Sequence, residues 1–231
     1  NIPPTVTITS PSNGSTFNAG PPITVAAQAS DMDGSVVKVV FYEGANKIGE
    51  DTLAPYEFTG TDVEPGTYRV IAKAYDNVGD SAVSDTVRIM VAGCTGSGSI
   101  SGEGFTDITG SRLINLASSS KYPNHPDVTA QLNQFEYGPN IGDNYGARVR
   151  GYICAPTTGN YTFYLTSDEQ SELWLSTDDN PANIRRIAYI EKTVGFRAWL
   201  ANVTGRSLPV RLVKGVRYYV EAVHKEGTGA D

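Results

Sequence analysis

TYRVIAKAY, residues 67–75, is the stretch that decides the fold of the first half of the chain. Every second residue from Tyr68 to Ala74 is apolar, whereas Arg69 and Lys73 fall on the opposite side. A period of two places one face of a β-strand on a core and leaves the other in solvent. The preceding Pro and Gly make Tyr68 typical of a tyrosine corner, in which the phenol hydroxyl satisfies a backbone group at the turn into the strand. We therefore expect a half-buried strand of a β-sandwich.

Similar short segments recur along the whole chain. With 24 glycines, 13 prolines and 13 tyrosines among 231 residues, the composition favours short strands and tight turns over helices. The predicted strands are residues 5–8, 23–29, 36–42, 56–60, 68–75 and 86–91 in the first half, and 147–153, 159–167, 171–176, 186–190, 208–213 and 216–224 in the second. The sequence predicts an all-β fold with two β-sandwich domains in tandem.

The stretch GCTGSGS at residues 93–99 carries no side chain that could pack a core, so it predicts a linker. It separates a predicted domain at residues 1–92 from a second at residues 100–231. Within the second, Lys214 and Gly215 separate the last two predicted strands and indicate a hairpin.

The net charge of −7 argues against a nucleic-acid partner, because phosphate binding draws on clustered Lys and Arg side chains. No stretch approaches the roughly 18 consecutive apolar residues of a membrane helix, so we expect no membrane insertion. The chain begins at Asn1 without a Met or a signal sequence, and we expect it to be a piece of a longer protein.

Cys94 and Cys154 could be two buried thiols, a metal pair or one disulfide. Cys94 lies in the flexible 93–99 stretch and Cys154 ends a predicted strand, so a bridge would pin the first segment of a domain to its sheet. The disulfide is the favoured alternative. It implies an oxidising compartment and therefore an extracellular location, secreted or at the cell surface.

The sequence offers few residues that could form a catalytic site. His125 and His224 are the only histidines, which excludes a three-histidine metal site, and no nucleophile-elbow sequence occurs. The acidic residues are too scattered to select a glycosidase pair. We expect no catalysis in this chain, which would fit an accessory region of a larger secreted enzyme.

The first half contains several motifs of one family: residues 3–11, ASDMDG at 29–34, VVFYEG at 39–44 and AKAYDNVG at 72–79. They resemble the bacterial immunoglobulin-like repeats of secreted glycosidases and adhesins. The resemblance covers about residues 1–92. It implies a bacterial source and a spacer that presents other domains.

The second half contains, in order, YPNHP at 122–126, LNQFE at 132–136, DNYGARVRGY at 143–152, TGNYTFY at 158–164, SDE at 167–169, SELWLS at 171–176 and KEG at 225–227. This order resembles the protective-antigen-type (PA-14) domain, over residues 100–231. The resemblance implies a carbohydrate-binding domain. Because the family closes with a further acidic loop and strand, we expect the C-terminal end of the domain to be missing after Asp231.

Adhesins of that family bind calcium through paired acidic residues and a later loop, and the bound sugar donates hydroxyls to the ion. Carried over to this chain, the resemblance implies calcium ligands at Asp168, Glu169, Glu226 and Asp231, although Glu169 stands where the family has aspartate. Ca²⁺ takes roughly 6–8 oxygens, so mixed carboxylate and hydroxyl ligands suit it. The alternative is a polar turn in which Asp168 hydrogen-bonds its own backbone.

A second calcium site could involve Asp31, Asp33 and Asp76, because an immunoglobulin-like topology brings their loops to the same end of the sandwich. Turn chemistry explains the same residues equally well, since Asp-x-Asp-Gly without further ligands is a weak motif.

Aromatic rings bind sugars by stacking on the C–H faces of the pyranose. Trp199, in the irregular 193–205 stretch, is the best candidate for an exposed ring. Further candidates are Tyr145, Trp174, Tyr189 and Phe196. In a small sandwich most such rings belong to the core.

Two functions follow. The first is a non-catalytic, extracellular module that binds a glycan or a cell-surface polysaccharide through calcium, carried on an immunoglobulin-like spacer. The alternative is a structural segment of a surface, filament or multidomain secreted protein, which contacts neighbouring domains and binds no ligand.

Overall fold

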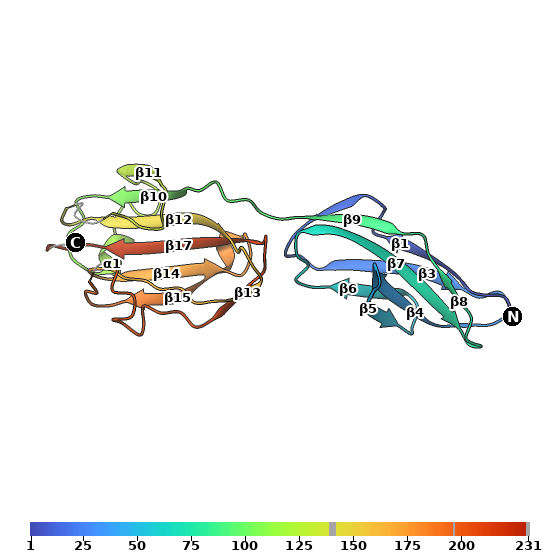
Figure 1. Cartoon of the computed structure of the whole chain (residues 1–231). Helices are drawn as coiled ribbons and strands as arrows, with labels where there is room; N and C mark the ends of the chain where they lie inside the picture. The colour runs from blue at the N-terminus through green and yellow to red at the C-terminus, as the bar shows by residue number, and fades with distance from the viewer. Residues whose placement is uncertain (139–141, 196, 230–231) are drawn as a thin grey trace. The chain divides into compact units, whose positions relative to one another are not determined.

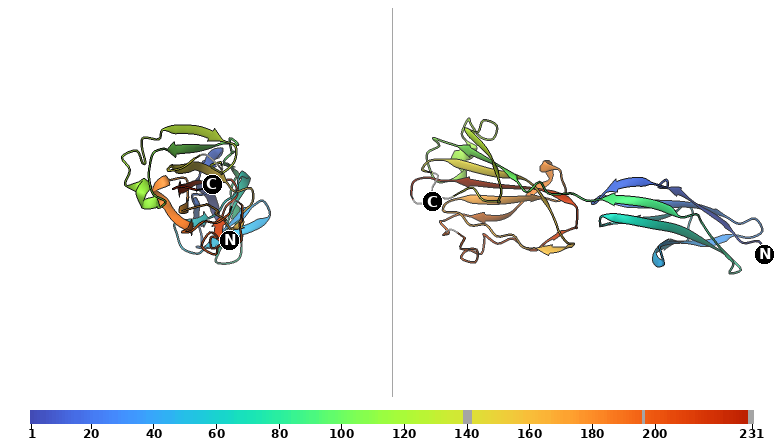
Figure 2. Two further views of the ribbon diagram at one scale, coloured as in Figure 1. Left: turned by 90° about the vertical axis from the view of Figure 1, so that its left-hand side faces the viewer. Right: turned by 45° about the horizontal axis from the view of Figure 1, so that its top comes forward.

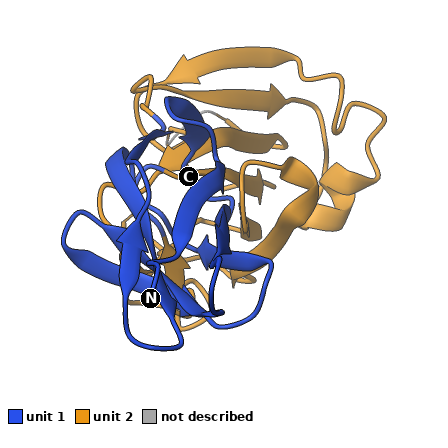
Figure 3. Cartoon of the chain, turned by 90° about the vertical axis from the view of Figure 1, so that its right-hand side faces the viewer, with its two compact units in different colours: residues 1–94, 213–215 blue, residues 95–212, 216–231 orange. Residues whose placement is uncertain are grey.

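The computed structural model describes residues 1–138, 142–195 and 197–229 (Figure 1). The chain divides into two compact units, one of residues 1–94 with 213–215 and one of residues 95–212 with 216–231 (Figure 3). Strands dominate both units in every view (Figure 2). The predicted all-β class with tandem β-sandwiches is confirmed.

Unit 1 is built from two sheets that enclose an apolar core. Its strands are β1 (Thr5–Ser10), β2 (Ser15–Asn18), β3 (Ile23–Ser30), β4 (Val36–Glu43), β5 (Asn46–Asp51), β6 (Tyr56–Gly60), β7 (Gly66–Asp76), β8 (Ser81–Val83) and β9 (Val87–Ala92). One sheet has the order β1-β3-β6, and the other has the order β2-β9-β7-β4-β5, with β8 also paired to β7. Val25 and Tyr56 of the first sheet and Phe41 and Ala72 of the second are buried in one cluster between them.

Strand β7 forms as its alternation predicts. Val70, Ala72 and Ala74 are buried, and the residues between them are partly exposed. The Tyr68 hydroxyl donates a hydrogen bond of 2.6 Å to the Glu64 carbonyl oxygen, which confirms the tyrosine corner. A residue whose ring packs on the core thus also ties down the turn that precedes its strand.

Unit 2 is organised around one large antiparallel sheet. Its elements are β10 (Ile100–Phe105), α1 (Leu113–Ala117), β11 (Val128–Leu132), β12 (Gly146–Cys154), β13 (Gly159–Tyr161), β14 (Ser171–Ser176), the 3-10 turn η1 (Pro181–Asn183), β15 (Ile184–Ile190), β16 (Val210–Leu212) and β17 (Arg217–Lys225). The large sheet has the order β11-β10-β12-β17-β14-β15, and β13 pairs with β16.

The predicted hairpin around Lys214 and Gly215 is wrong. Gly215 adopts a φ of +72°, as a turn requires, but the two strands that it joins enter different sheets. β16 pairs with β13, whereas β17 lies between β12 and β14. The predicted strand at residues 159–167 is likewise shorter and ends at Tyr161.

The large sheet of unit 2 has two different faces, which position the site. On one face Val223 of β17 packs with Phe105 and with Leu116 of α1 in a buried cluster. Because neighbouring residues of a strand point to opposite faces, Ala222 and His224 of the same strand lie on the other face. That second face holds the cavity described below.

Both cysteines, Cys94 and Cys154, are disulfide-bonded, which confirms the favoured alternative. Among the described residues, no helix has the length and apolar character that a membrane crossing requires.

Candidate functional site

A cavity of about 320 Å³ lies on the second face of the large sheet in unit 2. Its floor comes from three adjacent strands, because His224 of β17 pairs in register with Ala147 of β12 and with Ser171 of β14. In the next row Ala222 lies between Val149 and Leu173. Small side chains in both rows leave room above the sheet that large core residues would otherwise fill.

Aromatic side chains form much of the cavity wall, and they are Phe135, Tyr137, Tyr145, Tyr164 and Trp199. Trp199 is 44% exposed, whereas Tyr145 is 5% exposed. Tyr137 lies directly over Gly104 of β10, where a Cβ atom would collide with the tyrosine hydroxyl. Glycine at this position therefore lets the ring approach the sheet.

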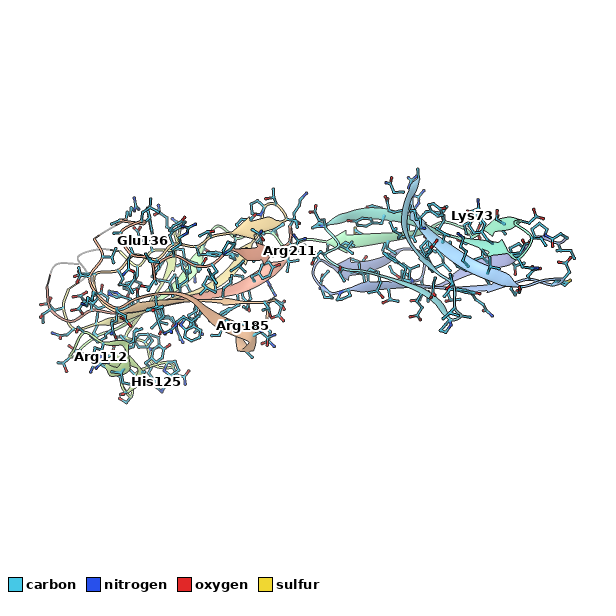
Figure 4. All side chains as sticks on the ribbon, turned by 90° about the horizontal axis from the view of Figure 1, so that it is seen from below. Lys73, Arg112, His125, Glu136, Arg185 and Arg211 are labelled. Atoms are coloured by element: carbon cyan, nitrogen blue, oxygen red, sulfur yellow. The ribbon has the colours of Figure 1, made fainter. Side chains whose placement is uncertain are left out.

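The polar side chains of the cavity carry hydroxyls, carboxylates and the imidazole of His224. The hydroxyl oxygens of Ser167 and Ser171 are buried and have no hydrogen-bond partner among the described residues. Asp168 is half-buried on the wall. Glu136, labelled in Figure 4, also lines the cavity, and its Oε2 lies 3.0 Å from Nη2 of Arg197. The residues lining the cavity in the described ranges include no Lys or Arg.

The residues of the predicted calcium set occupy two neighbouring places. Asp168 lines the cavity, whereas Oε2 of Glu169 accepts a 2.5 Å hydrogen bond from the backbone N–H of Gly227. The Glu226 side chain is fully buried, with its Oε2 3.7 Å from Nε2 of His224. Asp231 lies outside the described residues.

Lys225 brings a positive charge to the same acidic residues. Its side chain is fully buried and its ammonium donates to the backbone carbonyl oxygen of Glu226. Burial lowers the pKa of Lys225, and the negative charges of Glu169 and Glu226 oppose that shift. Within the described part of the chain, no three His, Cys, Asp or Glu side chains gather as a metal site would require. The described residues alone do not complete the calcium site, which stays a prediction.

The second predicted calcium site lies where two loops of unit 1 meet, since Ser35 N–H donates to Oδ1 of Asn77 at 2.9 Å. Oδ1 of Asp76 accepts from the backbone N–H groups of residues 78, 79 and 80, and its Oδ2 accepts from the Asn1 amide at 2.7 Å. Asp33 accepts from the N–H of Ile2 at 3.1 Å.

Asp31 is the third residue of that set, and only one of its two carboxylate oxygens is hydrogen-bonded in the turn. Its Oδ1 accepts from the N–H of Asp33 at 3.3 Å, and its Oδ2 is buried with no hydrogen bond to a described residue. The described contacts of this set are hydrogen bonds within the turns and from Asn1 and Ile2, and calcium here also stays a prediction.

The two histidines lie in different parts of unit 2. His224 is on the cavity floor, whereas Figure 4 shows His125 beside Arg112, on the opposite side of the unit from Glu136. One of the two histidines therefore lies at the cavity, and the Glu226 carboxylate is 3.7 Å from its Nε2.

The structure brings together two residues that the sequence selected for different reasons, Asp168 and Trp199. Tyr145 joins them in the wall, and Phe196 lies outside the described residues. Sequence reasoning missed Ser171 as a functional candidate. A serine in line with the buried Leu173 and Leu175 was a usable signal, but its meaning depends on the register with β17.

The geometry defines a class of protein: a tandem β-sandwich protein whose second domain holds a cavity of ligand size on one face of its main sheet. Residues 4–72 match the bacterial Ig domain, and residues 125–226 match the PA14 domain. The chain therefore carries a bacterial Ig domain followed by a PA14 domain, as the sequence motifs predict.

Two curated relatives show partial similarity. The chain is 31% identical over 129 residues to N-acetyl-beta-glucosaminyl-glycoprotein 4-beta-N-acetylgalactosaminyltransferase 1 of Mus musculus, over 53% of this chain and 12% of the relative. It is 37% identical over 90 residues to fibrocystin of Canis lupus familiaris, over 36% of this chain and 2% of the relative. The chain thus spans a small part of both proteins.

Among solved structures, the fibronectin(III)-like modules of Clostridium thermocellum CbhA are 36% identical to this chain. The match covers 38% of this chain and 94% of the other, with a TM-score of 0.36.

Proposed function

We propose that this chain is a non-catalytic carbohydrate-binding or adhesion module of an extracellular bacterial protein. Unit 2 contacts the glycan, and unit 1 serves as its spacer. One observation carries the proposal: Asp168 and Trp199 line the same cavity, in the unit that matches the PA14 domain. A partly exposed indole offers a stacking face for a pyranose, and buried hydroxyls without partners offer hydrogen bonds to its polar groups.

The cavity has the size and character of a small-molecule site. Its volume of about 320 Å³ lies at the lower end of the roughly 300–1,000 Å³ that such sites span, so it accommodates a short portion of a glycan. Aromatic walls combined with a few polar groups are typical of such sites. Extracellular placement is supported by the disulfide, because disulfides persist in oxidising compartments.

A glycan array tests the proposal, with hydrolysis of each bound glycan measured in parallel. We expect binding without hydrolysis, and Trp199→Ala should weaken binding about tenfold or more. The matched control is Leu200→Ala, because Leu200 is 82% exposed and is not part of the cavity lining. An array on which no glycan binds would instead favour the structural segment without a ligand.

Calcium enters the proposal as a separate part. Asp168, Glu169 and Glu226 are the described residues that would hold the ion, and Ca²⁺ accepts carboxylate, carbonyl, water and hydroxyl oxygens together. The array is therefore read in calcium and in chelator. Loss of binding in chelator, with the same loss in Glu169→Gln, would establish calcium dependence, whereas equal binding in both buffers would remove calcium from the function.

A further inference from the structure

The charge of the cavity bears on the kind of sugar that it accepts. Asp168 places a half-buried carboxylate on the wall. Glu136 adds a second carboxylate, which Arg197 pairs at 3.0 Å. The described lining residues contain no Lys or Arg that could meet an anionic ligand inside the cavity.

An acidic sugar would bring its own carboxylate or sulfate close to Asp168. Like charges repel more strongly in a partly desolvated cavity than in water, because the effective dielectric constant is lower. Juxtaposed like charges are a common means by which proteins reject a wrong partner. A neutral sugar avoids this cost, and a protonated amine next to Asp168 gains from the same charge.

The floor of the cavity supplies the complementary attraction. Ser171 is 2% exposed, and its hydroxyl has no hydrogen-bond partner among the described residues. A buried hydroxyl that lacks a partner costs free energy, which a ligand hydroxyl or amide recovers by pairing with it. Ala222 on the adjacent strand β17 and Ala147 on β12, one strand further, keep the space open down to the sheet.

We propose that this cavity selects neutral or amino-bearing sugars and rejects uronic, sialic and sulfated sugars. The inference rests on the proposed function, since it assigns the ligand class to the same site. It concerns the cavity without calcium, in which no ion neutralises the negative charge of Asp168.

Calorimetry on the whole chain tests the inference, in EDTA and again in calcium. The probes are tetrasaccharides of glucose, galactose and mannose, with their 2-amino-2-deoxy counterparts and their uronic acid counterparts. In EDTA, at least one neutral or amino-bearing probe should bind about tenfold or more tightly than its uronic acid counterpart. Asp168→Asn should reduce that preference by about tenfold, because it removes the repelling charge and keeps the shape.

Two further variants separate a binding effect from a folding effect. Ala222→Leu fills the cavity floor and should abolish binding while the melting temperature stays within a few degrees of the wild type. Asp179→Asn is the matched control for Asp168→Asn, because Asp179 is an exposed carboxylate paired with Arg217 at 3.2 Å outside the cavity. It should leave the preference unchanged.

The other outcomes each overturn the inference, and they distinguish it from the proposed function. Uronic acid probes that bind as tightly as their neutral counterparts would refute the selectivity. Glycan binding that ignores both Asp168→Asn and Ala222→Leu would place the ligand elsewhere. Glycan binding that needs calcium would mean that an ion held by Asp168, and not the free carboxylate, governs binding. Either result refutes the inference and leaves the proposed function standing. Absence of binding by every probe and by the full array would refute both.

Discussion

Glu103 is a buried carboxylate that holds two arginines of the neighbouring strand. It is 5% exposed, and its oxygens lie 2.5 Å from Nη2 of Arg148 and 2.7 Å from Nη2 of Arg150. Arg148 is also buried and donates at 2.8 Å to the carbonyl oxygen of Pro123, in the loop before β11. The network thus fastens a loop to the α1 side of the large sheet.

We expect Glu103→Gln to lower the free energy of unfolding by about 3 kcal/mol, because removing one partner leaves the Arg148 charge buried without compensation. Urea denaturation measures the change. Glu172→Gln is the matched control: its ion pair with Arg186 at 2.5 Å is partly exposed, and such pairs contribute about 1 kcal/mol or less. Equal losses in both variants would contradict the role assigned to Glu103.

At this same scale, the sequence predicts residues whose roles are local and misses those whose roles depend on register. Tyr68 is predictable because its hydroxyl reaches a carbonyl only four residues away. Ser171 is not, because its place in the cavity follows from its pairing with His224, which is 53 positions away in the numbering. Asp168 and Trp199 are selected individually, but their common cavity emerges only from the fold.

The carboxylate of Asp76 holds together the loop that follows β7. The Asn1 amide and the N–H groups of residues 78, 79 and 80 hold the pKa of Asp76 below its usual value. A carboxyl whose pKa is lowered in the folded state stabilises the protein fully above its unfolded-state pKa of about 3.9. That contribution is lost as the pH falls from there toward the lower folded-state pKa.

We therefore expect the melting temperature of unit 1 to fall as the pH drops below about 4, and Asp76→Asn to flatten this dependence. At pH 7 the variant should melt lower than the wild type, and the difference should shrink in acid. Scanning calorimetry between pH 7 and pH 2.5 measures both effects. The exposed Asp85→Asn serves as the control. Parallel pH profiles for the wild type and Asp76→Asn would show that Asp76 does not stabilise the loop through its charge.

Elements with strong alternation are the predictable ones. β7 and β14 can be predicted from the sequence because buried and partly exposed residues alternate along them. β10 reads ISGEGF, and its glycines accommodate Leu132 and Tyr137 instead of contributing side chains, so no alternation marks it. The wrong hairpin at Gly215 has a related cause: a turn signal shows that the chain reverses, but not which strands then pair.

For the whole molecule, the sequence predicts the fold class but not the chemistry of the site. Two series of short strands are enough to imply two sandwiches, because each series must bury an apolar face. The cavity in unit 2 depends instead on small residues at particular places in the sheet, such as Ala147 and Ala222. The sequence does not reveal the role of these small residues until the pairing of the strands is known.

The disulfide acts at this scale, because Cys94 and Cys154 close a long loop that contains α1 and both strands β10 and β11. Cross-linking such a loop restricts the unfolded chain and typically stabilises a protein by about 2–4 kcal/mol. We expect reductant to lower the melting temperature of the transition that includes β12, and a Cys94→Ala, Cys154→Ala double variant to show the same lower value with no response to reductant. That variant separates loss of the cross-link from other effects of the reductant. Identical melting of oxidised and reduced wild-type protein would mean that the bond is not needed for stability.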